Sequence, residues 1–287
     1  MKFGITLANS GRRCTPEFGV MLAQTAEELG FESLWTVEHT VVPIGYESRY
    51  PYSIDGRMPG EGVPIGDPLI WLAYAAAVTQ RIRLATGIVI LPQRNPLTLA
   101  KEISTLDVLS GGRVILGIGI GWLREEFDAL GVAFEDRAAR TDEYVDVMRT
   151  VWRQDEPSYA GATVRFGKLY SSPKPAQAGG PPIVVGGHSE AAARRAGRIG
   201  DGFFPYTIED PLEAVKLFDV ARQAARDAGR DPGALEFTTA GAMDLDGAKR
   251  FADAGVHRLV IPPLGKSSED LKQFLGTFAE NVIQPLR

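Results

Sequence analysis

The sequence has a single cysteine, and its apolar runs are short. Cys14 has no partner within the chain, so no internal disulfide can form, which fits a reducing compartment. The longest apolar stretch, Leu69–Val78, is well below the roughly 20 residues that a membrane-spanning helix needs. The opening run Met1–Ala8 is broken by polar residues and glycine and is too short for the apolar core of a signal peptide. We therefore expect a cytoplasmic protein with no membrane partner.

Basic residues and metal ligands are also scarce. The 31 lysine and arginine residues are outnumbered by 36 acidic ones, and the net charge of −5 disfavours a nucleic acid as partner. Only three histidines accompany the single cysteine, and no HxH or HExxH motif occurs, so no metal site is expected. The hydrophobic content of 44% is typical of a globular enzyme with a substantial core, and a small molecule is the expected partner.

What the chain does contain is a regular alternation of β-like and helical segments. Each short apolar run is followed by a longer segment with helical periodicity, which is typical of a parallel sheet. Eight such units in 287 residues indicate one α/β domain spanning 1–287, a (β/α)8 TIM barrel. A doubly wound open sheet has the same repeat, so the count alone leaves it as a rival. The expected strands are Lys2–Ala8, Ser33–Val37, Ile82–Leu91, Arg113–Ile120, Pro182–Val185, Gly202–Tyr206, Leu235–Ala240 and Arg258–Ile261.

The helical segments carry their own start and stop signals. Asp67 before Pro68 and Ser189 after a buried strand are typical N-caps, and Gly30 suits a C-terminal cap. The expected helices are Glu17–Leu29, Pro68–Thr79, Leu97–Leu109, Asp136–Trp152, a segment from Ser189 to Ile199, a segment that ends at Gly229, Asp246–Ala254 and Ser268–Val282.

Two long stretches fit no unit and are expected to be insertions on the barrel. Thr40–Gly66, after strand 2, is rich in proline, glycine and tyrosine. Gln154–Gly180, before strand 5, contains a candidate hairpin around Tyr159–Tyr170. Long insertions on compact domains are often lids or walls of a substrate site, so both stretches are candidates for that role.

In a (β/α)8 barrel the active site lies at the carboxyl ends of the strands, and few residues there carry chemistry. His39 directly follows the second strand, and a histidine can pass a proton near neutral pH. Glu38 stands beside it in the sequence, so we expect these two residues to form the catalytic pair. A histidine that merely ends a strand at the surface is the alternative. Trp122 and Tyr206, at the ends of strands 4 and 6, are expected to line the substrate pocket.

Two glycine clusters also fall at strand ends. Gly186-Gly187-His188-Ser189 joins strand 5 to a helix, and its backbone amides together with the helix N-terminus outline a phosphate cradle. The alternative is a tight turn in which Ser189 is an ordinary N-cap. Gly117–Gly121 lacks the third glycine of a dinucleotide-binding fingerprint, because Trp122 or Arg124 stands at that place. These glycines favour the close approach of a flat ring or of a neighbouring backbone instead.

At these positions the chain resembles the bacterial-luciferase-like superfamily and, within it, the branch that depends on coenzyme F420. The resemblance covers essentially the whole chain, and its most specific block is Leu106–Gly121 continued by Trp122–Phe127. Trp122 departs from members that carry an acid after the glycine run, and Glu38 departs from F420-binding members that have aspartate. The other matching segments are Phe3–Leu7, Glu28–Trp35, Glu38-His39, Leu84–Ile88, Pro92, Arg94–Pro96, Pro173–Pro175, Gly186-Gly187 and Gly197–Phe203.

The resemblance implies a barrel that holds a flavin or a 5-deazaflavin across the strand ends. In similar proteins a non-prolyl cis peptide in strand 3 forms a bulge behind the ring, and the matching bond here is Gly87–Ile88. Gly186-Gly187 would bind the cofactor phosphate, and His39 would lie near the reactive carbon. The implied cofactor-binding residues are Leu7, Ala8, Gly87, Ile88, Gly119, Glu125, Gly186, Gly187 and His188.

The first functional hypothesis is an oxidoreductase that moves a hydride between coenzyme F420 and a small organic substrate, with His39 handling the coupled proton. The alternative is an FMN-dependent monooxygenase that uses O2 and reduced flavin from a separate cofactor-reducing enzyme. A barrel that only stores cofactor is a third hypothesis, and an unrelated barrel enzyme such as an isomerase or aldolase is a fourth. By analogy with the family, a homodimer is expected.

Overall fold

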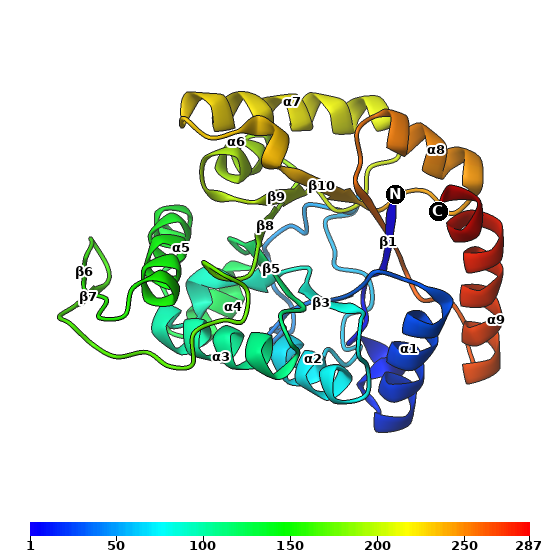
Figure 1. The fold of residues 1–287 in the computed structure, drawn as a ribbon, viewed down its shortest axis with the longest axis horizontal. Coiled ribbons are helices and arrows are strands. Elements are labelled where there is room, and N and C mark those ends of the chain that lie inside the picture. Colours follow the sequence, from blue (N-terminus) through cyan, green and yellow to red (C-terminus); the bar gives the residue numbers. More distant parts are fainter.

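The computed structural model describes residues 1–287, and its main sheet is closed into a ring. Neighbouring strands of the ring pair in parallel; β1 joins β11 on one side, and β3 pairs with β5 to complete the circle. The doubly wound open sheet is thereby excluded, and the (β/α)8 barrel is confirmed (Figure 1). The strands of the ring are β1 (Lys2–Ile5), β2 (Ser33–Thr36), β3 (Arg83–Thr86), β4 (Val89–Ile90), β5 (Val114–Gly119), β8 (Ile183–Gly186), β9 (Gly202–Phe204), β10 (Glu236–Thr239) and β11 (Arg258–Ile261).

Helices surround the ring (Figure 1), and local sequence explains where they begin. Helices α2 and α3 each start with proline in the first turn, and the side chains of Asp67 and Asn95 accept hydrogen bonds from the exposed amides that follow. The short helix α4 has no counterpart among the expected helices. No helix is both long enough and apolar enough to cross a membrane. The helices are α1 (Pro16–Leu29), α2 (Pro68–Ala77), α3 (Pro96–Leu109), α4 (Arg124–Ala129), α5 (Arg137–Arg153), α6 (Glu190–Ile199), α7 (Pro211–Asp227), α8 (Leu245–Asp253) and α9 (Ser268–Phe278).

The third barrel strand is interrupted, whereas the sequence predicts one run over Ile82–Leu91. Strand β3 ends at Thr86 and β4 begins at Val89, and the Gly87–Ile88 peptide between them is cis. The cis bond that the resemblance implies is thus confirmed. Strand β4 still pairs with β5, so the chain bulges at Gly87–Ile88 and then returns to the barrel wall.

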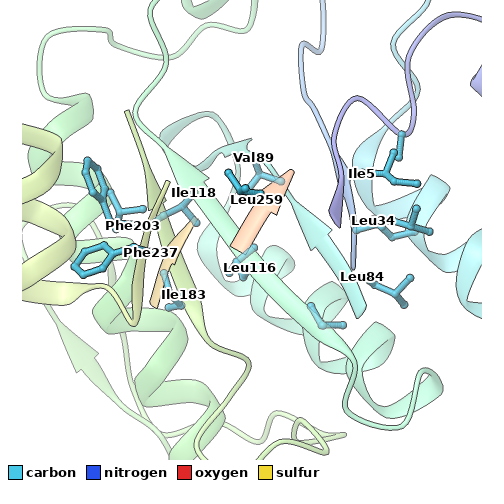
Figure 2. Close-up of a cluster of buried hydrophobic side chains, with 14 of the residues drawn as sticks. Ile5, Leu34, Leu84, Val89, Leu116, Ile118, Ile183, Phe203, Phe237 and Leu259 are labelled. Atoms are coloured by element: carbon cyan, nitrogen blue, oxygen red, sulfur yellow. The ribbon is translucent and has the colours of Figure 1, made fainter. Parts of the chain in front are cut away.

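Two apolar clusters fill the protein on either side of the barrel wall. The larger cluster has 52 buried residues between strands and helices, and Figure 2 shows part of it, with Ile5, Leu34 and Leu84 on neighbouring strands. In the smaller cluster, inside the ring, Trp35 and Phe204 meet edge to face with ring centroids 5.2 Å apart. Strands buried on both faces are apolar throughout, which explains the continuous apolar runs of the sequence. The inner cluster comprises Trp35, Ala85, Ile115, Val184, Phe204, Ala240 and Val260.

Buried charges close the end of the barrel where the strands begin. The fully buried Arg258, first residue of β11, donates to Glu32 through Nε at 2.7 Å and Nη2 at 2.8 Å. Its Nη1 donates to Thr238 Oγ1 at 3.1 Å and pairs with Glu236, which also binds Lys2. Burial opposes ionisation of the two glutamates, but the charge and hydrogen bonds of Arg258 prevail and lower the pKa of both Glu32 and Glu236.

The insertion over residues 40–66 returns to the barrel beside the end of β1. Ser10 forms an antiparallel bridge with Ile65, and the amide of Gly66 donates to the carbonyl of Asn9 at 3.0 Å. The Asn9 side-chain amide reaches back to the carbonyl of Val37 at 2.7 Å. The insertion is therefore tied down at its end to the loop that follows β1.

The second insertion contains the expected hairpin. Strands β6 (Tyr159–Ala160) and β7 (Arg165–Phe166) pair antiparallel and lie outside the barrel, beyond α5 (Figure 1). Glu143 of α5 accepts from the amides of Thr163 at 3.0 Å and Val164 at 2.9 Å, which fixes the hairpin turn to the helix layer. This insertion lies away from the strand ends at which the site is expected.

Candidate active site

The carboxyl ends of the strands carry two residues with left-handed backbone. Leu7, after β1, has a φ of 55°, and Tyr206, after β9, has a φ of 63°. This conformation costs a residue with a side chain roughly 1–2 kcal/mol, so the surrounding structure must hold it. The carbonyl of Leu7 accepts from Arg13 Nε at 3.0 Å, and that of Tyr206 accepts from Thr239 Oγ1 at 2.7 Å. Maintained strain of this kind clusters at functional sites and directs attention to this end of the barrel.

His39, which follows β2, is held by a carboxylate from a distant part of the chain. Its Nδ1 lies 2.9 Å from Oε2 of Glu126 on α4, whose side chain is 0% exposed. Oε1 of Glu126 accepts from the backbone amides of Thr40 at 2.7 Å and Val41 at 3.3 Å. The Trp122 ring packs edge-on against the imidazole with centroids 5.8 Å apart. Only Nε2 of His39 is left to meet a substrate.

Glu38 faces a different partner from the one that the sequence predicts. It accepts from Nε of Arg94 at 2.8 Å and from the amide of Ile90 at 2.5 Å, and Arg94 also reaches Asp67 at 2.9 Å. Burial raises the pKa of the Glu38 carboxyl, and the charge and hydrogen bonds of Arg94 oppose that rise. The expected pairing with His39 is therefore wrong. Adjacent side chains on an extended segment point to opposite sides, so Glu38 ties β2 to β4 while His39 meets α4.

Three glycines admit the bulged segment of the third strand. A β-carbon on Gly119 would lie 2.7 Å from Cδ1 of Ile88, and one on Gly186 would lie 2.7 Å from its Cγ2. A β-carbon on Gly117 would lie 1.8 Å from the carbonyl oxygen of Thr86. The expectation of close backbone approach at this glycine run is thus confirmed at Gly117. At Gly119 and Gly186 the close contacts are with the side chain of Ile88, which belongs to the bulge that the resemblance puts behind a cofactor ring.

The turn after β8 has the open amides of an anion site. The amide of Gly187, a residue with a φ of +131°, donates to the carbonyl of Phe204 at 3.2 Å. The next two amides, those of His188 and Ser189, donate to no acceptor in the protein. Ser189 Oγ meanwhile accepts from the amide of Ala192 at 3.2 Å and caps α6. The Ser189 side chain is therefore an ordinary N-cap, while the backbone amides of His188 and Ser189 stay open. Open N–H groups beside a helix N-terminus favour an anion, so the N-cap and the phosphate cradle are compatible.

Tyrosine rings of the first insertion cover the strand ends. Tyr50 packs edge-on against Trp122 with centroids 5.2 Å apart, and Tyr52 packs in the same way against Tyr206 at 5.7 Å. Tyr52 also stacks on the ring of His188 at 6.0 Å, with 18° between the planes. Burial raises the pKa of Tyr50, Tyr52 and Tyr206, so all three are neutral phenols at physiological pH. The structure thus brings Trp122 and Tyr206, the expected substrate-pocket residues, together under one cover.

Glu125, the neighbour of Glu126 on α4, anchors this cover. Its Oε1 accepts from the amides of Glu47 at 2.6 Å and Ser48 at 3.0 Å. Burial opposes ionisation, but hydrogen bonds from Ser48 and from the backbone prevail and lower the pKa of Glu125 to about 2. The contacts of Glu125 are with the insertion, and its direct contact with a cofactor stays a prediction.

Four buried polar side-chain atoms have no hydrogen-bond partner, and all belong to residues that follow strand ends. They are Oγ1 of Thr6 after β1, both amide heteroatoms of Gln93 after β4, and Oε2 of Glu125 after β5. Buried polar groups in folded proteins nearly always have partners, so a group of exceptions calls for a cause. With the open amides after β8, these atoms fit a ligand that has polar ring edges and an anionic tail. A flavin or 5-deazaflavin of the kind that the resemblance implies has both.

Sequence reasoning missed Glu126, and it did not single out Tyr50 and Tyr52 within the insertion that it expected to form a lid or wall of the site. No pattern in the sequence singles out Glu126, because its burial beside Phe127 is visible only in the structure. The signal for the tyrosines is their spacing, since Tyr46, Tyr50 and Tyr52 lie in one part of a loop. That signal does not say which strand end these side chains reach.

Comparisons with known proteins point to one family. The family model described as "Luciferase-like monooxygenase" matches residues 1–260. An uncharacterized protein of Mycobacterium tuberculosis is 33% identical to this chain over 98% of this chain and 99% of its own length. The FMNH2-dependent dimethylsulfone monooxygenase of Pseudomonas fluorescens is 28% identical over 93% of this chain and 75% of its own length.

Solved structures with the same fold include a monooxygenase and an F420-dependent reductase. The monooxygenase RslO1 from Streptomyces bottropensis superposes with a TM-score of 0.78 at 25% identity, covering 100% of both chains. The coenzyme F420-dependent tetrahydromethanopterin reductase from Methanopyrus kandleri gives a TM-score of 0.78 at 18% identity, covering 100% of this chain and 99% of its own. At that identity the second likeness concerns the fold.

Proposed function

Because the chain belongs to the luciferase-like monooxygenase family, we propose that this enzyme moves a hydride between coenzyme F420 and a small organic substrate. The observation that carries the proposal is the state of His39 at the strand ends. Its Nδ1 is taken up by Glu126 at 2.9 Å, and its Nε2 has no partner in the protein. A histidine placed in this way can handle the proton that accompanies a hydride.

Coenzyme F420, when bound, supplies a ring carbon that gives or receives the hydride. The open amides of His188 and Ser189 would hold its phosphate, assisted by the N-terminus of α6. Nε2 of His39 would give a proton to the substrate or take one from it. Tyr50 and Tyr52 would exclude water from the reacting groups, since the insertion already covers the strand ends.

Coenzyme F420 is the first candidate cofactor, because the sequence resembles the F420-dependent branch of the family. The F420-dependent reductase of Methanopyrus kandleri has the same fold over 100% of this chain. The second candidate is an FMN-dependent monooxygenase, because the Pseudomonas enzyme is 28% identical over 93% of this chain. In that case a separate enzyme would supply the reduced flavin, and O2 would be the second substrate.

The test is a fluorescence titration of the purified protein with F420 and, separately, with FMN. Binding of F420 in preference to FMN supports the first proposal. Preferential FMN binding, with oxygen uptake when reduced FMN and candidate substrates are supplied, supports the second. Binding of neither cofactor overturns both.

A matched pair of variants locates the cofactor's phosphate. Ser189→Asp keeps an N-capping residue on α6 but adds a negative charge beside the open amides. We expect cofactor affinity to fall about tenfold, which corresponds to roughly 1.4 kcal/mol of like-charge repulsion. Ser267→Asp makes the same change at the N-cap of α9 and should leave the affinity unchanged. Equal affinities for the two variants would contradict the placement of the phosphate.

We also propose that the enzyme forms a homodimer through α2. This helix has no charged residue, and its outward-facing Ile70 and Tyr74 are 74% and 46% exposed. The same face of a second copy can pack against it, so that two α2 helices cover each other and neither helix buries a charge of its own. Light scattering should give twice the chain mass for the wild type and a monomer for the double variant Ile70→Glu, Tyr74→Glu. A monomeric wild type would contradict this assembly.

A further inference from the structure

The buried carboxylate of Glu126 contacts both His39 and the start of the insertion that covers the strand ends. Oε2 of Glu126 lies 2.9 Å from Nδ1 of His39, while Oε1 accepts from the amides of Thr40 and Val41, the first two residues after that histidine. We propose that Glu126 is a positioning residue that holds His39 in a single tautomer, so that Nε2 is the atom that exchanges a proton with the substrate. The inference deepens the proposed function and, in its kinetic consequences, rests on it.

The argument starts from what a carboxylate can do. An ionised carboxylate accepts hydrogen bonds and donates none, so the atom of His39 that faces it must carry a hydrogen. The neutral imidazole then has its hydrogen on Nδ1 and a free lone pair on Nε2. The protonated imidazole keeps the same Nδ1 hydrogen bond and gains its second hydrogen on Nε2. The proton therefore comes and goes at Nε2 only.

The surroundings of Glu126 prevent it from turning away. Its side chain is 0% exposed, and His39 is its sole ion-pair partner. The amides of Thr40 and Val41 require an acceptor at Oε1, which leaves Oε2 for the imidazole. Because both ends of the carboxylate are engaged, the ring of His39 is held in orientation as well as in tautomer.

The other titratable groups near His39 have partners of their own. Glu38, its neighbour along the chain, is paired with Arg94. Tyr46 and Tyr50 of the insertion pack on Trp122, which lies between them and the imidazole in the series of ring contacts. Glu126 is thus the group that decides which nitrogen of His39 carries the hydrogen. Reduction of a substrate then adds a hydride at one atom and the Nε2 proton at its neighbour, and oxidation removes both.

The variant Glu126→Gln turns this arrangement into a measurable switch. The amides of Thr40 and Val41 still need an oxygen, so the glutamine must direct its NH2 group at Nδ1 of His39. Nδ1 then accepts a hydrogen bond, and the hydrogen of the neutral imidazole moves to Nε2. The same number of atoms occupies the same space, so the change acts through hydrogen-bond direction.

Nitrogen-15 spectra of the histidines read the tautomer in the protein without any cofactor. The chain has three histidines, and single substitutions of His188 and His257 assign the remaining signal to His39. We expect the neutral wild type to carry the hydrogen on Nδ1 and the Glu126→Gln variant to carry it on Nε2. A wild type with the hydrogen on Nε2, or an unchanged spectrum in the variant, overturns the inference. The wild-type spectrum alone decides the first point, even if the variant fails to fold.

Glu125→Gln is the matched control. This neighbouring glutamate on the same helix also accepts from two backbone amides of the insertion, those of Glu47 and Ser48, but it has no contact with His39. It removes the same charge and should leave the His39 spectrum as in the wild type. A tautomer change in this control would show that charge, and not the hydrogen bond of Glu126, sets the tautomer, and would also overturn the inference.

Turnover provides the second readout once a substrate is available. We expect Glu126→Gln to lower kcat about 100-fold, the lower range of what general acid–base catalysis contributes, with little change in KM. If neither F420 nor FMN binds but the nitrogen spectra switch as described, the proposed function fails and the positioning role of Glu126 stands.

Discussion

The two ends of the barrel differ in whether their buried polar groups have partners within the protein. Where the strands begin, Arg258 is fully buried, and its hydrogen bonds to Glu32 and Thr238 and its ion pair with Glu236 satisfy the charges there. Where the strands end, four buried polar atoms lack partners, and Leu7 and Tyr206 hold left-handed backbone. One end is complete by itself, and the other is built as if a ligand were to complete it. Stabilising contacts at one end and the proposed function at the other match the division that is usual for this architecture.

The largest expected effect is on the free energy of unfolding, and it comes from replacing Arg258 at the end of the barrel where the strands begin. Arg258→Met removes the guanidinium from Glu32 and Glu236, whose side chains are 23% and 28% exposed. It should lower the free energy of unfolding by about 3 kcal/mol, the lower end of the range for breaking a buried ion pair, because both carboxylates are only partly buried. Urea unfolding at neutral pH measures this change in the free energy of unfolding. Arg226→Met removes an arginine from the surface of α7 and should change stability by less than about 0.5 kcal/mol. A loss below about 1 kcal/mol for Arg258→Met would contradict the view of this end as the stabilising one.

A second prediction compares two glycines of β5, one in the wall and one toward the strand end. Gly117→Ala puts a β-carbon 1.8 Å from a backbone oxygen, which cannot move freely. We expect it to lower the free energy of unfolding by roughly 1–3 kcal/mol through overpacking. A β-carbon at Gly119 meets a side chain instead, with Cδ1 of Ile88 at 2.7 Å and its Cγ1 at 2.9 Å, so Gly119→Ala should cost less than half as much because a side chain shifts more easily than a backbone carbonyl. Thermal unfolding compares the two, and equal losses would show that Ile88 is as rigid as the backbone.

The third prediction concerns the cover of the ligand end. Tyr52→Ala removes the ring that stacks on His188 and touches Tyr206, so bound cofactor should dissociate about tenfold faster, equivalent to roughly 1.4 kcal/mol. Stability should change by less than about 1 kcal/mol, because an aromatic contact outside the core contributes little more. Stopped-flow fluorescence and urea unfolding measure the two quantities. Tyr170→Ala, a change at an 83% exposed ring of the other insertion, should affect neither.

The smallest expected effect is the pH dependence of the stability that Glu32 contributes at the end where the strands begin. The pKa of Glu32 is lowered in the folded state by Arg258, so its stabilising contribution is fully present above the unfolded pKa of roughly 4.3. It is lost as the pH falls through the lower, folded value. Glu32→Gln should therefore be less stable than the wild type at pH 7 by about 1 kcal/mol, the net value of a hydrogen bond. Urea unfolding of both proteins at a series of pH values should show the difference in unfolding free energy narrowing once the pH falls below roughly 4.3, and a constant difference would contradict the assigned cause.

Much of the fold follows from local patterns. The strands lie within about one to three residues of the expected ranges, because apolar runs between turn residues specify where a buried strand can be, although not where it stops. Proline at the first turn after Asp67 located the start of α2, whereas α3 begins at Pro96, one residue before the expected Leu97. Helix α4 escaped prediction because six residues are too few to show a helical period.

The site could be predicted in part. His39, Trp122, Tyr206 and the turn after β8 follow from one rule, that the carboxyl ends of barrel strands meet at one face. The predicted pairing of Glu38 with His39 is wrong because side chains adjacent in an extended segment point to opposite sides.

The sequence by itself determined the repeat of strand and helix, the length of the two insertions and the strand end at which each polar residue emerges, because these depend on local periodicity and on chain order. Only the tertiary structure decided partners. His39 meets a glutamate 87 residues away, and Tyr52 of the insertion stacks on His188 of the cradle. Closing a ring of parallel strands brings distant segments to one face, and the packing of α4 and the insertion there selects which side chains touch.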